Sequence, residues 1–166
     1  PGDAEYRMIA RDIRLARETG ARLHIAHPST ADGVEMVRKA KSDGVRITAE
    51  VSPHHFTLTD DAVSTYGANA KMNPPLRAER DRTAVVEGLA DGAIDAIATD
   101  HAPHAEYEKE RGMNRAPFGI VGLETALGLT LRLVQQGRLT LERAITCLTS
   151  APAAVLGLPK GILKPG

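Results

Sequence analysis

Residues 93–104 read Ala-Ile-Asp-Ala-Ile-Ala-Thr-Asp-His-Ala-Pro-His, a short apolar run that leads directly into a carboxylate and two imidazoles. The apolar part predicts a buried strand over 93–99 that ends at Asp100 and His101. Zinc prefers imidazole nitrogen and carboxylate oxygen, and a hydrolytic site also needs a base that moves protons. Asp100 suits that role; a capping role would explain Asp100 but not the neighbouring His101 and His104. This stretch is therefore the first candidate for a functional site.

Two earlier segments repeat the same arrangement of helix, strand and polar strand end. Apolar residues recur at helical spacing from 4 to 19, before Gly20, and a short strand is predicted over 22–27. A second strand is predicted over 45–51 and leads into residues 52–55, Ser-Pro-His-His. Further helices are predicted over 30–42, 78–89, 119–136, 139–148 and 151–156. Strands that alternate with helices indicate right-handed βαβ units and a parallel sheet, so the predicted fold class is α/β.

The 166 residues suffice for one ordinary domain, and we assign residues 1–166 to a single domain. Three predicted strands are too few for a closed eight-stranded barrel, and an open three-stranded sheet exposes an edge that proteins normally cover. The chain opens with Pro1-Gly2 rather than Met and stops in the turn-like residues 163–166. We therefore expect a domain that is cut at both ends and completed by a missing segment or by another chain.

Composition narrows the classes of partner. Twenty-one basic residues balance twenty-one acidic ones, so no net field favours nucleic acid or an anionic membrane surface. No apolar run approaches the ~20 residues of a membrane span, and the N-terminus lacks the pattern of a signal peptide. The single cysteine, Cys147, excludes an internal disulfide and fits a reducing compartment. We expect a cytoplasmic protein whose partners are small molecules or other proteins.

Histidines also stand at the other two predicted strand ends. His24 and His27 are three residues apart on a strand, so their side chains should point to opposite faces. His27, at the strand end, is the better candidate ligand, and His24 is interpreted as a strand residue packed between layers. For His54 and His55 a functional role is as well supported as a structural one, in which one bonds the loop and the other faces solvent.

Two loops carry further candidates. The prolines of residues 71–77, Lys-Met-Asn-Pro-Pro-Leu-Arg, would fix the backbone and so orient Asn73 and Arg77, whose side chains recognise carboxylates. A stiff structural loop explains that segment equally well. Residues 116–119, Ala-Pro-Phe-Gly, either bring backbone amides to a ligand at a helix start or form a simple helix entry.

Five segments in this order resemble the successive motifs of the dihydroorotase branch of the amidohydrolase superfamily. They are HIAHPST at 24–30, EVSPHH at 50–55, AKMNPPLR at 70–77, IATDHAPH at 97–104 and APFGIVGLETA at 116–126. Together they run through nearly the whole chain. The resemblance implies the last three βα units of a (βα)8 TIM-type barrel with two zinc ions at its C-terminal mouth.

The resemblance also assigns roles to single residues. It implies that His27 binds one metal and that Asp100 binds the other and acts as the general acid/base. It implies that Asn73 and His104 hold the substrate carboxylate. It implies further that the loop of Phe118 and Gly119 contacts the pyrimidine ring through its backbone.

The activity implied by the resemblance is the reversible, zinc-dependent closure of N-carbamoyl-L-aspartate to dihydroorotate in pyrimidine biosynthesis. It further implies a homo-oligomer, with aspartate carbamoyltransferase as a candidate protein partner. The remaining metal ligands of the family belong to segments before Pro1, so we expect no complete zinc site in this chain alone. Pro28 also stands where the family has a small aliphatic residue.

Two other functions fit the same residues. One is a hydantoinase- or allantoinase-like cyclic amidase; Asn73 and His104 argue against it because they suit a substrate with a free carboxylate. The other is an inactive dihydroorotase homologue that scaffolds aspartate carbamoyltransferase. The intact residues His27, Asp100 and His104 argue against that alternative, since a scaffold has no need of them.

Overall fold

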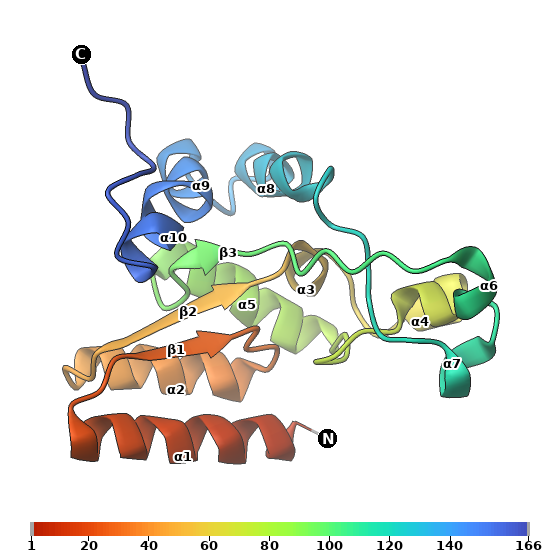
Figure 1. The fold of residues 1–166 in the computed structure, drawn as a ribbon, viewed down its shortest axis with the longest axis horizontal. Helices are drawn as coiled ribbons and strands as arrows, with labels where there is room; N and C mark the ends of the chain where they lie inside the picture. The colour runs from red at the N-terminus through yellow and green to blue at the C-terminus, as the bar shows by residue number, and fades with distance from the viewer. Residues whose placement is uncertain (1, 166) are drawn as a thin grey trace.

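A computed structural model describes residues 2–165, and Pro1 and Gly166, the two ends of the expected domain, lie outside the described residues. The described chain contains three strands, ten α-helices and one 3₁₀ helix (Figure 1). In chain order they are α1 Asp3–Thr19, β1 Leu23–Ala26, α2 Ala31–Ser42, β2 Ile47–Val51, α3 Pro53–Thr57, α4 Ala62–Tyr66, η1 Gly67–Ala70, α5 Glu79–Asp91, β3 Ala96–Ile97, α6 Glu106–Lys109, α7 Gly112–Arg115, α8 Ala126–Gln135, α9 Leu141–Leu148 and α10 Ser150–Val155.

The three strands form one parallel sheet in the order β1-β2-β3. Leu23 pairs with Ile47 at the start of β1, and Glu50 of β2 pairs with both Ala26 and Ala96. The α/β class and the parallel sheet are therefore confirmed. Because all three strands run the same way, their carboxyl ends meet at one edge of the sheet.

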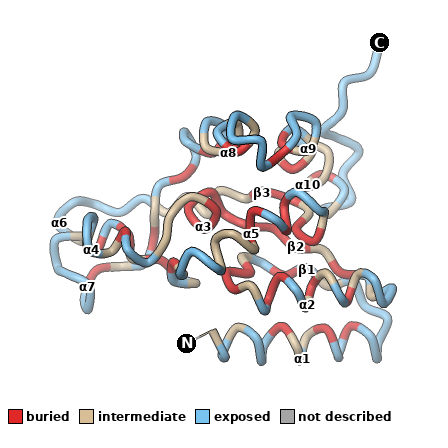
Figure 2. The backbone as a smooth tube through the Cα atoms, turned by 180° about the vertical axis from the view of Figure 1, so that it is seen from behind, coloured by how far each residue is buried: buried red, intermediate tan, exposed pale blue. Residues whose placement is uncertain are grey.

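One face of the sheet is covered by helices, and this face holds much of the core. Ile25, Ile47 and Ala49 pack against Ile9 of α1 and Val37 of α2. A second cluster joins α5 and α9 to the end of the sheet and includes Val51, Leu89, Ile94 and Cys147. Figure 2 shows that the buried residues are concentrated in β2, α2, α3 and α5, while the outer side of α1 is exposed.

Capping residues fix the C-terminus of α1 and the N-terminus of α2. Gly20 takes the left-handed backbone conformation with φ of 70° and ends α1, as the sequence predicts. Thr30 caps α2 by accepting a hydrogen bond from the Gly33 N–H at 3.0 Å.

Three expectations need correction. The helix predicted from 119 begins only at Ala126, because residues 119–122 run extended beside the turn that follows β3, where His101 pairs with Ile120. Residues 52–55, expected only as the polar end of the second strand, enter α3 from Pro53 onward, since proline is well suited to the first turn of a helix. His24 is exposed rather than packed between layers, and its Nδ1 contacts the Thr48 hydroxyl at 2.8 Å.

A helix that crosses a bilayer must be about 20 residues long and predominantly apolar. Across residues 2–165, no helix is both long and apolar enough to cross a membrane.

The core makes a direct stability prediction. Leu89→Ala removes a fully buried side chain of α5 and should lower the free energy of unfolding by about 2–5 kcal/mol, measured by urea titration. Leu163→Ala is the matched control, because Leu163 is fully exposed, and it should change stability by no more than about 0.5 kcal/mol. Equal effects of the two variants would contradict the assigned core.

Candidate active site at the carboxyl edge of the sheet

Two residues at the carboxyl edge of the sheet have an unusual backbone. Within residues 2–165, His27 and Asp100 are the only non-glycine residues with positive φ, at 53° and 44°. Such a conformation costs on the order of 1–3 kcal/mol and is found preferentially at functional sites. It turns the two side chains together, so that His27 Nε2 lies 4.0 Å from Asp100 Oδ2, with 25% and 30% of the side chains exposed. The two residues predicted to be metal ligands are thus neighbours with open sides.

Glu50 of β2 orients His27. Its carboxylate oxygen Oε1 accepts the His27 backbone N–H at 3.2 Å and lies 2.7 Å from the ring Nδ1. The contact with Glu50 raises the pKa of His27, against the opposing effect of burial. Because Nδ1 faces Glu50, Nε2 is the ring nitrogen that faces Asp100.

His54 and His55 are buried within α3 and do not share the open site. Both contact the Ser52 hydroxyl, His54 through Nε2 at 2.8 Å and His55 through Nδ1 at 2.5 Å. His55 Nε2 donates to the Pro74 carbonyl at 2.9 Å and so anchors the loop that carries Asn73. The prediction that one histidine bonds the loop is confirmed, whereas the alternative that the other faces solvent is wrong, since His54 is only 4% exposed.

Burial decides the protonation of His54. It lowers the pKa of His54 to about 3, and the nearby rings of His55 and His27 act in the same direction. Burial also lowers the pKa of His55. Both rings are therefore neutral near pH 7, which suits residues that support a loop.

Arg77 is committed to a contact inside the protein. Its guanidinium donates to the Ser29 hydroxyl at 3.0 Å and contacts Glu5 Oε2 at 3.4 Å. Asn73, in the same loop, is exposed. Of the two side chains proposed from the sequence to recognise a carboxylate, Asn73 is thus the one that is open to a ligand.

Glu5 organises the turn after β1 and was missed by the sequence reasoning. Its carboxylate accepts hydrogen bonds from the backbone N–H and the hydroxyl of both Ser29 and Thr30, at 2.5–2.9 Å. These bonds fix the backbone two residues after His27. An isolated glutamate on an amphipathic helix gives no sequence signal of such a role.

The predicted substrate residues His104, Phe118 and Gly119 lie together. His104 Nε2 donates to the Phe118 carbonyl at 2.9 Å. Gly119 has φ of 148°, and an added Cβ would lie 2.6 Å from the Ala102 carbonyl oxygen, so the close approach requires glycine. Asn73 belongs to a neighbouring loop, which is tied to this one by the Gly119 N–H donating to the Lys71 carbonyl at 2.9 Å.

His101 supports the same turn without contacting the His27 and Asp100 pair. Its Nδ1 accepts the backbone N–H groups of Gly122 and Leu123, each at 3.1 Å. This holds the approach to α8 against the strand end. His101 therefore acts as a structural residue of the turn.

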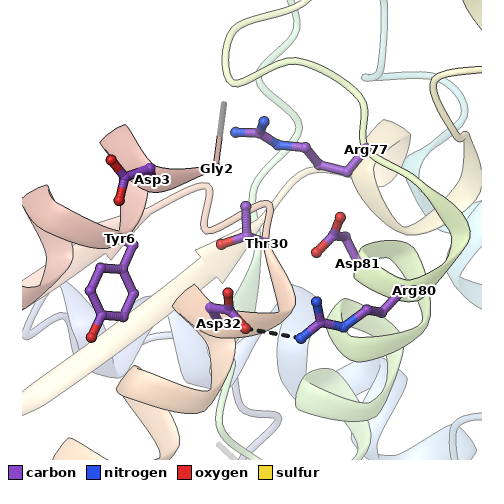
Figure 3. Close-up of a pocket in the computed structure, with 8 residues that line it drawn as sticks. All are labelled: Gly2, Asp3, Tyr6, Thr30, Asp32, Arg77, Arg80 and Asp81. Atoms are coloured by element: carbon purple, nitrogen blue, oxygen red, sulfur yellow. Dashed lines mark hydrogen bonds and ion pairs between the residues drawn. The ribbon is translucent and has the colours of Figure 1, made fainter.

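A cavity of about 490 Å³ lies where the N-termini of α1, α2 and α5 meet (Figure 3). It is lined by Gly2, Asp3, Tyr6, Thr30, Asp32, Arg77, Arg80 and Asp81. Its charges are largely paired, with Arg80 donating to Asp32 at 3.0 Å and Arg77 turned to Glu5. Of the residues predicted for the site, Arg77 alone lines it, and Arg77 is committed to Ser29 and Glu5, so this cavity is not the candidate site.

The donor set at the strand edge has the chemistry of a zinc site, an imidazole nitrogen beside a carboxylate oxygen. In residues 2–165 no three His, Cys, Asp or Glu side chains are grouped so that they could hold a metal ion. The side chains of His27 and Asp100 therefore fit a partial metal site, to which each would supply one donor.

The comparison with protein families matches residues 2–166 to the amidohydrolase family. The chain belongs to the amidohydrolase family. It is 60% identical to a dihydroorotase of Pelotomaculum thermopropionicum and 58% identical to one of Syntrophotalea carbinolica, over the whole chain in each case. The chain spans 39% of the length of these curated relatives.

Solved structures show the same fold. The chain superposes on an L-hydantoinase (dihydropyrimidinase) from Arthrobacter aurescens with a TM-score of 0.94 at 35% identity, covering all of this chain and 38% of that one. A D-hydantoinase (dihydropyrimidinase) from Thermus sp. gives a TM-score of 0.92 at 28% identity, with the same coverage. The arrangement of strands and helices is therefore that of cyclic amidases.

The buried state of His54 predicts a pH dependence of stability. Its pKa is about 3 in the folded protein against 6.5 as the usual value, so the unfolded state binds more protons in between. His54 thus destabilises the fold as the pH falls from 6.5 towards 3. In urea titrations, His54→Gln should reduce the loss of stability between pH 6 and pH 4.5 by up to about 1.4 kcal/mol per pH unit. An identical pH slope in both proteins would show that His54 is not buried neutral.

Proposed function

We propose that the polypeptide carrying this chain is a dihydroorotase, which closes N-carbamoyl-L-aspartate to dihydroorotate reversibly. The observation that carries the proposal is the pairing of His27 and Asp100, both in strained backbone conformations, at the carboxyl edge of the sheet. Identities of 60% and 58% to curated dihydroorotases support the same reaction. In this proposal the three βα units are the last three of a (βα)8 barrel.

His27 and Asp100 would hold the metal ions, His27 through Nε2 and Asp100 through its carboxylate, each at a different ion. Zinc, when bound, lowers the pKa of a water to about 7 and polarises the amide carbonyl. Residues supplied by the remainder of the polypeptide complete the ligand set. Glu50 contributes by keeping the His27 ring turned so that Nε2 faces the site.

Asp100 is the general acid/base of the proposed mechanism. In the hydrolytic direction its carboxylate takes a proton from the attacking water and delivers it to the ring nitrogen that leaves. The open side of Asp100 allows a substrate to approach, and its backbone is fixed by the turn that follows β3. The reverse sequence of proton transfers closes the ring.

Recognition of the substrate carboxylate is assigned to Asn73 and His104. Asn73 is exposed on a loop that His55 anchors through the Pro74 carbonyl. The His104 ring is held beside the 116–119 loop because its Nε2 donates to the Phe118 carbonyl at 2.9 Å. The backbone of Phe118 and Gly119 would contact the pyrimidine ring.

We also propose the substrate class, the pathway, the compartment and the oligomeric state of the enzyme. Its substrates are small molecules, its pathway is pyrimidine biosynthesis, and it works in the cytoplasm as a homo-oligomer. Association with aspartate carbamoyltransferase stays a prediction.

A cyclic amidase of the hydantoinase type is the second candidate, favoured by the TM-score of 0.94 to the L-hydantoinase. Steady-state assays of the zinc-loaded full-length enzyme on dihydroorotate, hydantoin and allantoin separate the two. We expect turnover of dihydroorotate to exceed that of the other two by at least about a hundredfold, because only dihydroorotate offers a carboxylate to Asn73 and His104. Turnover of hydantoin or allantoin alone would transfer the assignment to that class, and no turnover of any of them would favour an inactive homologue.

The role of Asp100 is tested by Asp100→Ala in the same full-length enzyme. Turnover of dihydroorotate should fall by at least about a hundredfold, as expected for loss of a general acid/base, while the melting temperature stays close to that of the wild type. Asp60→Ala is the matched control, because the Asp60 side chain is exposed and the group that bonds the Arg77 carbonyl, at 2.9 Å, is the backbone N–H, which alanine retains. An Asp100→Ala enzyme that kept more than a few per cent of its rate would exclude Asp100 as the proton shuttle.

A further inference from the structure

Lys109, the last residue of α6, is directed at backbone carbonyl groups. Its ammonium donates to the carbonyls of Pro117 at 3.0 Å, of Gly119 at 2.6 Å and of Ala68 in η1 at 3.2 Å. These bonds join α6 to the loop that follows it and to η1, which lies 41 positions earlier in the sequence. An ammonium has three N–H donors, and all three are used here.

The contact is not an ion pair. Within residues 2–165 no carboxylate lies within 4.0 Å of Lys109 Nζ. Burial lowers the pKa of Lys109, and the neighbouring charge of Lys71 lowers it further. Holding a partly buried cation without a counter-charge is unfavourable, and the three carbonyl contacts offset part of that cost.

Four consecutive carbonyls of residues 116–119 accept hydrogen bonds from basic side chains. Lys71 donates to Ala116 at 2.6 Å, Lys109 donates to Pro117 and Gly119, and His104 donates to Phe118. The Gly119 N–H donates to the Lys71 carbonyl, and a Cβ added at Gly119 would lie 2.6 Å from the Ala102 carbonyl oxygen, so the backbone at Gly119 packs closely against Ala102. The segment is therefore held from both sides.

We propose that Lys109 is a positioning residue that fixes residues 116–119 in the conformation that receives the substrate. Lys109 itself does not touch the reacting atoms. It supplies two of the four bonds to the loop carbonyls and links the loop to η1, so it does more to order the loop than Lys71 or His104 alone. The identity of the substrate in this proposal rests on the proposed dihydroorotase function. The ordering of residues 116–119 by Lys109 does not depend on that function.

The first test measures loop order in the full-length polypeptide by amide hydrogen exchange. Lys109→Met removes all three bonds while keeping a long side chain, and the Gly119 amide should exchange at least about tenfold faster. Lys39→Met is the matched control, because Lys39 lies on the exposed face of α2 with 73% of its side chain exposed, and it should leave the exchange unchanged. Unchanged exchange in Lys109→Met would overturn the proposal.

The second test uses dihydroorotate kinetics of the same variants. An unfixed loop must be ordered by the substrate, so the KM of Lys109→Met should rise about tenfold while kcat changes by less than about threefold. Lys109→Arg, which keeps the charge, should recover part of both the exchange protection and the KM. If Lys109→Met fails to fold, Lys109→Gln, which has a shorter polar side chain without the charge, takes its place with the same expected rise in Gly119 exchange and in KM.

The outcomes separate the two proposals. Faster exchange with an unchanged KM would overturn the role of Lys109 in substrate binding. A wild-type enzyme that does not turn over dihydroorotate would refute the proposed function and the kinetic part. Its exchange data would still decide whether Lys109 orders the loop.

Discussion

Parallel pairing of β1, β2 and β3 is the constraint on which the site depends. It places residues that are more than seventy positions apart, His27 and Asp100, at one edge of a sheet, where their side chains come within 4.0 Å. The left-handed backbone at both positions then turns the side chains towards each other. A strand slipped by one residue would move every side chain to the other face and separate the pair.

Buried carboxylates hold this edge in shape. Glu50 fixes the ring of His27, and Glu5 fixes the turn that follows it through Ser29 and Thr30. The side chains of Glu50 and Glu5 are 7% and 12% exposed, and the hydrogen bonds that Glu5 accepts offset much of the cost of removing its charge from water. In the same way, three backbone carbonyls accept hydrogen bonds from the ammonium of Lys109 and offset part of its desolvation cost. The site is therefore positioned by polar groups that are placed by the sheet and by the helices packed on it.

Local patterns predicted the frame and the ends of its strands. The helices α1, α2 and α5 and the strands β1 and β2 follow from apolar periodicity and from Gly20, and His27 and Asp100 were singled out because polar residues end parallel strands at a site. Contacts between distant segments were not predictable. Glu5, Glu50 and Lys109 act on partners at least eight positions away in sequence, and no local spacing links any of them to its partner. The helix expected from residue 119 was wrong for the same reason, since His101 holds residues 119–122 extended by pairing with Ile120 and by accepting the Gly122 N–H.

Anomalous diffraction at the zinc edge, from crystals of the full-length polypeptide loaded with zinc, tests most directly whether His27 and Asp100 belong to one metal centre. One peak should lie within about 2.3 Å of His27 Nε2 and another within the same distance of an Asp100 carboxylate oxygen. Zinc bound instead by His54 or His55, or zinc absent from both His27 and Asp100, would contradict the assignment of the catalytic centre to this edge of the sheet.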